Sequence, residues 1–93
     1  MYIDRRGREW ARWPDVTAPP GKELEISFDA GATWIPMERE DATTVRVLVA
    51  GPEAPTPHPE GTAVLRKGRN VATVRLSAAP EVLVRDAGII HVR

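Results

Sequence analysis

The sequence predicts an all-β fold, an immunoglobulin-like antiparallel β-sandwich of about seven short strands. Two observations lead to this prediction. Apolar residues recur mostly at every second position, which is the period of a strand with one buried face. Turn-forming residues interrupt the pattern at intervals of roughly 8 to 12 residues, a spacing typical of β-sandwiches and barrels. The 93 residues have room for one domain, and a small open barrel is the alternative architecture.

The first 21 residues predict an extended N-terminal arm. Arginines are interleaved with Trp10 and Trp13, and prolines follow. Tryptophan and arginine are the residue types most enriched at interface hot spots, so Trp10, Arg12 and Trp13 are candidate interface residues. The alternative is that the two tryptophans fold back and cap one end of the sandwich.

The sandwich domain is expected over residues 22–93, and its clearest strand spans residues 22–28. Leu24, Ile26 and Phe28 face one side of this strand, and polar residues, Ser27 among them, face the other.

A second strand over residues 43–50 presents Val45, Val47 and Val49 on one face, in agreement with the β propensity of valine. The other strands are expected at residues 33–38, 63–65, 70–77, 81–85 and 89–92.

Two of the connections predict hairpin turns, one over residues 66–70 and one at Asp86-Ala87-Gly88. In each, a glycine can adopt the positive φ that such turns require. A third connection, residues 51–61, contains four prolines and predicts a stiff, exposed loop. Pro55 and Pro57 in this loop are further interface candidates.

One local motif is specific. Residues 27–34, Ser-Phe-Asp-Ala-Gly-Ala-Thr-Trp, match the pattern S-x-D-x-G-x-T-W. We expect a hairpin in which Asp29 accepts backbone bonds, Gly31 takes a left-handed conformation and Trp34 packs across the turn. Ser27 and Thr33 can add local side-chain bonds.

This motif resembles the Asp-box of sialidases and other β-propeller glycosidases. In that family the boxes lie away from the catalytic site, so the resemblance implies a structural hairpin. The motif occurs once here, and a propeller needs at least about four blades, so we do not expect glycosidase activity.

The composition argues against several classes of function. Thirteen basic and thirteen acidic residues balance, which disfavours nucleic-acid and anionic-membrane partners. The chain has no cysteine and only two histidines, and they fit no recognisable metal site. We therefore expect no enzymatic activity, no metal and no cofactor.

Residues 21–34 and 79–93, together with the short arm, resemble the small β-sandwich virion proteins of tailed bacteriophages of actinobacteria. The resemblance implies a structural component at the head–tail junction (a head–tail connector), the capsid or the tail surface. Its location would be the virion, assembled in the host cytoplasm, and its partners other virion proteins and copies of itself. One alternative is a carbohydrate-binding or host-surface attachment module that uses Trp34 beside Glu38 to bind a glycan. The other is an accessory domain or small regulatory protein of cellular origin.

Overall fold

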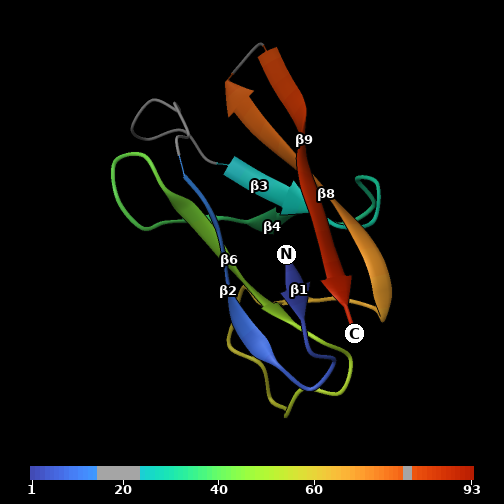
Figure 1. Cartoon of the computed structure of the whole chain (residues 1–93). Helices are drawn as coiled ribbons and strands as arrows, with labels where there is room; N and C mark the ends of the chain where they lie inside the picture. The colour runs from blue at the N-terminus through green and yellow to red at the C-terminus, as the bar shows by residue number, and fades with distance from the viewer. Residues whose placement is uncertain (15–23, 79–80) are drawn as a thin grey trace.

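The computed structural model describes residues 1–14, 24–78 and 81–93, which form nine strands and no helix (Figure 1). The strands are β1 (Tyr2–Ile3), β2 (Arg8–Trp13), β3 (Leu24–Ser27), β4 (Ile35–Pro36), β5 (Glu38–Arg39), β6 (Val45–Ala50), β7 (Ala63–Val64), β8 (Gly68–Ala78) and β9 (Glu81–Val92). The prediction of an all-β fold is confirmed. No helix in these residues is long and apolar enough to cross a membrane.

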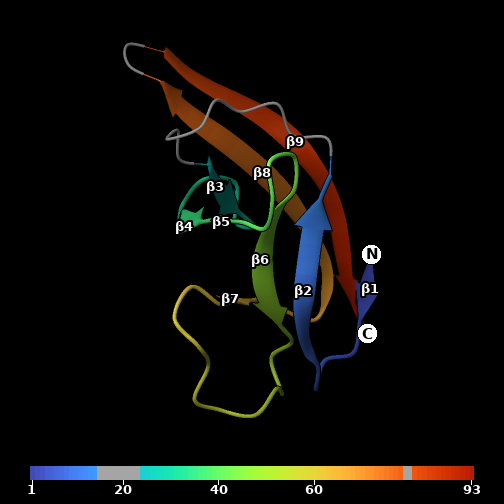
Figure 2. The ribbon, with the colours of Figure 1, turned by 90° about the vertical axis from the view of Figure 1, so that its left-hand side faces the viewer.

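The strands form two sheets that enclose one core. The first sheet has the order β1-β9-β8-β3-β4, and the second has the order β2-β6-β5, with β7 also paired to β6. Figure 2 shows β2 and β6 on one side of the molecule and β8 and β9 on the other. The core residues come from both sheets: Ile3, Ala11, Ile26, Val47, Val49, Ala63, Leu65, Ala72, Ile90 and Val92. The architecture is therefore sandwich-like.

The alternation of apolar residues predicts the buried faces of the central strands. Val45, Val47 and Val49 of β6 are all buried, as are Leu24 and Ile26 of β3. Ser27 was expected on the wet face of its strand, and this expectation is wrong, because its exposed fraction is 0%. The strand ends at Ser27, and its hydroxyl turns inward to bind the loop that follows.

The first 13 residues are part of both sheets rather than a separate arm. β1 pairs in parallel with β9, and β2 pairs along its full length with β6. Ile3 and Ala11 lie in the core, where Ala11 is 2% exposed. The arginines of β2 stand on its outer face, so residues 8–13 form an amphipathic strand. The arginine-rich and tryptophan-rich composition that predicts an arm is therefore that of a strand with one exposed face. Residues 15–21 of the expected arm lie outside the described residues.

The predicted turn at Asp86-Ala87-Gly88 is wrong, because residues 81–92 form one continuous strand. The pairing of β8 with β9 shifts between Val71 and Thr73, where Ala72 alone lies opposite both Ala87 and Gly88. This arrangement is a β-bulge, and Gly88 there has a φ of 95°. Both a bulge and a tight turn require a residue with positive φ, which glycine adopts readily.

The predicted hairpin at residues 66–70 is also wrong, since this segment crosses from one sheet to the other. β7 pairs with β6, whereas β8 begins at Gly68 in the opposite sheet. The buried Asn70 side-chain amide holds the crossing by donating to the carbonyl groups of Arg66, Gly68 and Ile90. The expected strand at residues 33–38 likewise divides between the sheets, as β4 and β5.

The proline-containing loop joins β6 to β7 and is attached to the β1–β2 turn. Gly51 donates its amide proton to the carbonyl of Gly7 (2.9 Å), and Glu53 donates to that of Arg5 (2.8 Å). Pro55 and Pro57 are exposed. The two chain ends lie close together beside this turn (Figure 1), and the amide of Arg5 donates to the carbonyl of Arg93 (2.9 Å).

Candidate protein interaction surface

The three candidate residues on β2 lie on opposite faces of the strand, because side chains alternate along it. Trp13 shares the inner face with the buried Ala11, whereas Trp10 and Arg12 lie on the outer face of the four-stranded sheet. The structure therefore separates the two tryptophans that the sequence suggested as a pair.

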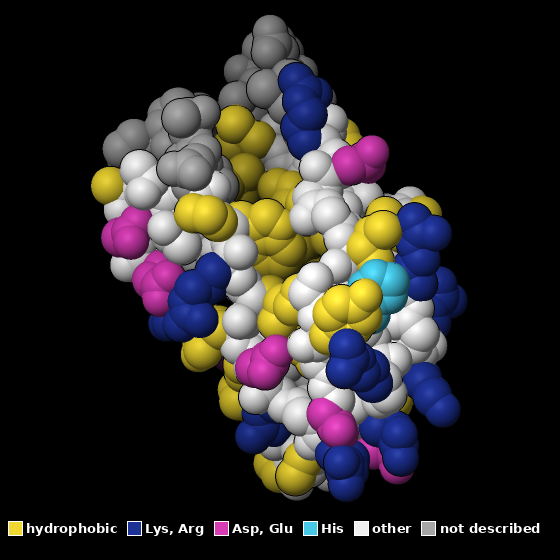
Figure 3. All heavy atoms as spheres, in the orientation of Figure 1, with side chains coloured by type: hydrophobic (Ala, Val, Ile, Leu, Met, Phe, Trp, Pro, Cys, Tyr) yellow, Lys and Arg dark blue, Asp and Glu magenta, His cyan; other side chains and the backbone are white. Residues whose placement is uncertain are grey.

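Trp13 connects the two sheets. Its half-buried ring packs against the core, and its indole Nε1 donates a hydrogen bond of 2.7 Å to the carbonyl of Ala87. Ala87 lies in the bulge of β9, so the irregular backbone places an acceptor where the indole can reach it. A hollow of about 230 Å³ between β2 and β9, visible in Figure 3, is lined by Trp13, Met1 and Ile89. Trp13 thus caps the open side of the sandwich.

Trp10 lies beneath the guanidinium of Arg46, whose Cζ is 3.9 Å from the ring centroid. The register explains this contact. Trp10 on β2 lies opposite Leu48 on β6, and Arg46 is two residues before Leu48 on the same outer face, so it lies diagonally opposite Trp10. A cation over a tryptophan face is attracted by the ring quadrupole. The contact also covers one face of the indole.

Two carboxylates hold Arg46 in this position. Glu38 on β5 accepts a hydrogen bond of 2.9 Å from Arg46 Nη2, and Glu40 lies 3.6 Å from Arg46 Nη1. Glu40 also accepts two bonds from Arg12 Nε, at 3.0 and 3.1 Å. We call the outward residues of this sheet the Trp10 surface: Arg8, Trp10, Arg12, Glu38, Glu40, Arg46 and Leu48.

The proline-containing loop lies against this surface. Arg8 donates a hydrogen bond of 3.1 Å to the carbonyl of Pro55. Between loop and sheet is a shallow hollow of about 320 Å³ that Trp10, Leu48 and Pro59 help to line. Pro55 therefore lies beside the candidate residues of β2, whereas none of the described side-chain bonds involves Pro57.

Sequence reasoning missed Arg46, Leu48 and Glu40, and it placed Glu38 beside Trp34 rather than beside Arg46. The alternation in residues 43–50 already places Arg46 and Leu48 on one outward face. The pairing of this strand with β2 joins segments that are far apart in the sequence, and no local pattern indicates it. The stacking of Arg46 on Trp10 could therefore not be predicted.

The hairpin at residues 27–34 is held by side chains of its own. Ser27 Oγ donates to Asp29 Oδ1 (2.7 Å) and accepts from the amide of Gly31 (2.9 Å), while the amide of Thr33 donates to Asp29 Oδ1 (2.8 Å). Gly31 has a φ of 88°. The hydroxyl of Ser27, and next the amide of Thr33, lower the pKa of the Asp29 carboxyl from its ordinary value of 3.8.

Trp34 and Glu38 take different partners. The Trp34 ring lies against Gly31 and beneath the guanidinium of Arg75, at 4.2 Å from its centroid to Cζ. Arg75 in turn bonds to Glu25 in the five-stranded sheet, whereas Glu38 bonds to Arg46 in the other sheet. The two residues suggested for sugar binding therefore contact different sheets.

In the described part of the chain, no three histidine or carboxylate side chains gather in a way that could hold a metal ion. Comparisons with protein families, with curated proteins and with solved structures find no match for this chain.

Proposed function

We propose that this chain is a non-enzymatic structural module whose Trp10 surface makes protein–protein contacts. The observation that carries the proposal is the stacking of Arg46 on Trp10, with Glu38 hydrogen-bonded to that same guanidinium and Glu40 in an ion pair with it. Tryptophan and arginine dominate interface hot spots. Side chains already held in place lose little conformational freedom when a partner binds, which favours association.

The assembly that we propose is the particle of a tailed bacteriophage, at its head–tail junction, capsid or tail surface. The resemblance of residues 21–34 and 79–93 to small virion sandwiches supports this setting. We further propose that the sandwich is immunoglobulin-like in shape. Partners would be other virion proteins and further copies of the chain.

The test compares wild type with Trp10→Ala in purified particles, with copies counted by quantitative mass spectrometry against the major capsid protein. We expect Trp10→Ala to lower incorporation at least about tenfold, since a central interface tryptophan contributes about 2 to 4 kcal/mol. Val84→Ala, which truncates an exposed residue of β9, is the control and should leave incorporation unchanged.

Two outcomes would contradict the proposal. One is the absence of the wild-type chain from clean particles while it is expressed in the cell. The other is equal incorporation of wild type and Trp10→Ala. The attachment alternative stays a prediction, and quenching of the tryptophan fluorescence by host-wall polysaccharide would favour it.

A further inference from the structure

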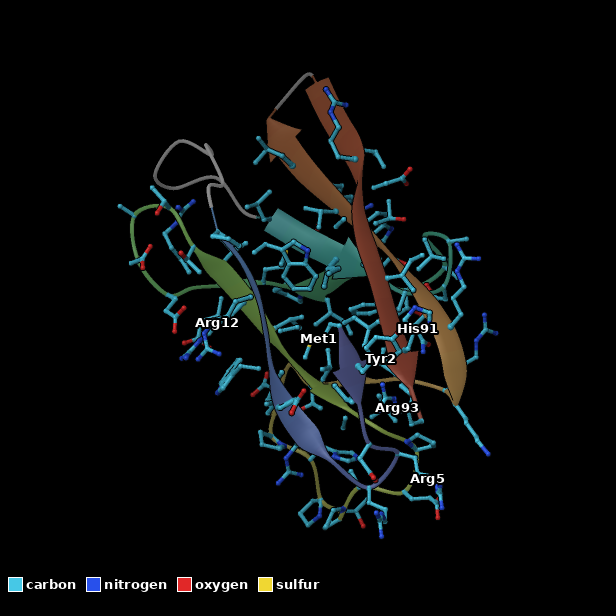
Figure 4. All side chains as sticks on the ribbon, viewed as in Figure 1. Met1, Tyr2, Arg5, Arg12, His91 and Arg93 are labelled. Atoms are coloured by element: carbon cyan, nitrogen blue, oxygen red, sulfur yellow. The ribbon has the colours of Figure 1, made fainter. Side chains whose placement is uncertain are left out.

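A second group of side chains gathers where the two chain ends meet, on the outer face of the five-stranded sheet. The rings of Tyr2 and His91 stack with centroids 4.8 Å apart and an interplanar angle of 18°. The guanidinium Cζ of Arg93 lies 4.3 Å from the Tyr2 centroid. Figure 4 shows Tyr2, His91 and Arg93 close together, so the phenol ring has two neighbours from β9 and its end.

Positive charge accumulates around this stack. Arg69 on β8 is the cross-strand partner of His91, and Arg66 and Lys67 directly precede β8. Within the described residues, the ion pairs that arginine and lysine form shorter than 4.0 Å involve five other arginines: Arg5, Arg6, Arg12, Arg46 and Arg75. Figure 3 shows lysine and arginine side chains gathered beside the lower end of β9. The chain is neutral as a whole, yet among the described residues none of Arg66, Lys67, Arg69 and Arg93 forms such an ion pair.

Apolar surface adjoins these charges. Tyr2 is 59% exposed, and Val71, which follows Arg69 on the same face of β8, is 46% exposed. We name Tyr2, Arg69, Val71, His91 and Arg93 the Tyr2 cluster. It combines guanidinium groups, which suit carboxylates, with apolar side chains, which suit apolar partners.

We propose that the Tyr2 cluster binds an acidic segment of a partner protein, one in which carboxylates alternate with apolar side chains. Single-stranded nucleic acid is the less suitable occupant, because a base stacks on a free aromatic ring and the Tyr2 ring already stacks on His91 and contacts Arg93. Val71 also favours a protein over a phosphate backbone. This site goes beyond the proposed function, since it lies on the opposite outer face of the sandwich from the Trp10 surface.

The test measures fluorescence anisotropy of a labelled peptide of alternating glutamate and valine, titrated with the full chain at low salt. We expect saturable binding that weakens as salt is added. Arg69→Gln with Arg93→Gln should reduce the affinity at least about tenfold. The matched control, Arg39→Gln with Arg85→Gln, removes the same charge from exposed positions elsewhere and should change the affinity less than about twofold.

Three results would overturn the inference. An oligothymidylate of equal charge that binds more tightly than the peptide would identify a nucleic-acid site. Equal losses in the two double variants would show attraction without a defined site, and the lack of peptide binding at low salt would contradict the proposal directly. Trp10→Ala should leave peptide binding intact, so failure here and failure of the proposed function are distinguishable.

Discussion

At the scale of single residues, Trp10 and Trp13 lie three positions apart on one strand and face opposite sides of its sheet. Trp13 faces inward and bonds to the backbone of the opposite sheet, while Trp10 faces outward beneath Arg46. The sequence could indicate that both tryptophans matter. It could not assign their roles, because the assignment depends on which face of β2 meets the core.

The two tryptophans should differ in their contribution to stability. Trp13→Ala removes core packing and leaves the carbonyl of Ala87 without its indole donor, so we expect a loss of about 2 to 4 kcal/mol in the free energy of unfolding. Trp10→Ala should cost about 1 kcal/mol or less, since it loses mainly the contact with Arg46. Urea denaturation followed by circular dichroism measures both. Equal losses would contradict the proposal that Trp10 acts in binding a partner and contributes little to stability.

Asp29 predicts how stability changes in acid. Its pKa is lowered in the folded chain, so the unfolded chain binds more protons as the pH falls below about 3.8. The contribution of Asp29 is therefore fully present above that pH and is lost as the pH falls through the lowered, folded value. Asp29→Asn should reduce the slope of stability against pH in this window, measured by urea denaturation at successive pH values. An unchanged slope would show that the turn bonds do not depend on the charge.

At the scale of elements, the contact between the β6–β7 loop and the β1–β2 turn depends on a glycine. A Cβ added to Gly51 would lie 2.6 Å from Arg5 Cα, and nearer still to the carbonyl of the same residue. The clash is with backbone, which cannot move aside without breaking the bonds that join Gly51 to Gly7 and Glu53 to Arg5.

Gly51→Ala should therefore destabilise the fold by more than about 3 kcal/mol or prevent folding altogether. Gly61→Ala is the matched control in the same loop. There the φ of 80° disfavours alanine, but no atom lies within 4 Å of the added carbon, so we expect about 1 kcal/mol. Thermal melts of the two variants make the comparison, and a Gly51→Ala protein as stable as the control would show that the turn and the loop are not held together.

The sequence predicts those elements whose pattern or bonds lie within a short stretch of adjacent residues. β6 shows its alternating valines, and eight adjacent residues supply all the side-chain bonds of the hairpin at residues 27–34. The sequence alone does not distinguish the bulge in β9 from a turn, because both need a glycine with positive φ. Only the partner strand distinguishes them, since β8 continues past the bulge without reversing.

At the scale of the whole molecule, what sequence reasoning missed is the order of strands. β1 pairs with β9 across nearly the full length of the chain, and the segments at residues 33–38 and 63–68 switch sheets. Such pairings depend on how the two sheets pack around one core. A short stretch of sequence contains no information about that packing. The sequence predicts an arm in place of β1 because residues 2–3 are too few to show the period of a strand.

The parallel pairing of β1 with β9 also determines how the molecule would respond to force. A pull on Met1 and Arg93 in opposite directions would act along these strands and try to slide one past the other. The backbone bonds between Met1 and Ile89, Met1 and His91, Ile3 and Arg93, and Arg5 and Arg93 would then bear the load together instead of opening one after another. We therefore expect the fold to resist a force that pulls its two chain ends apart.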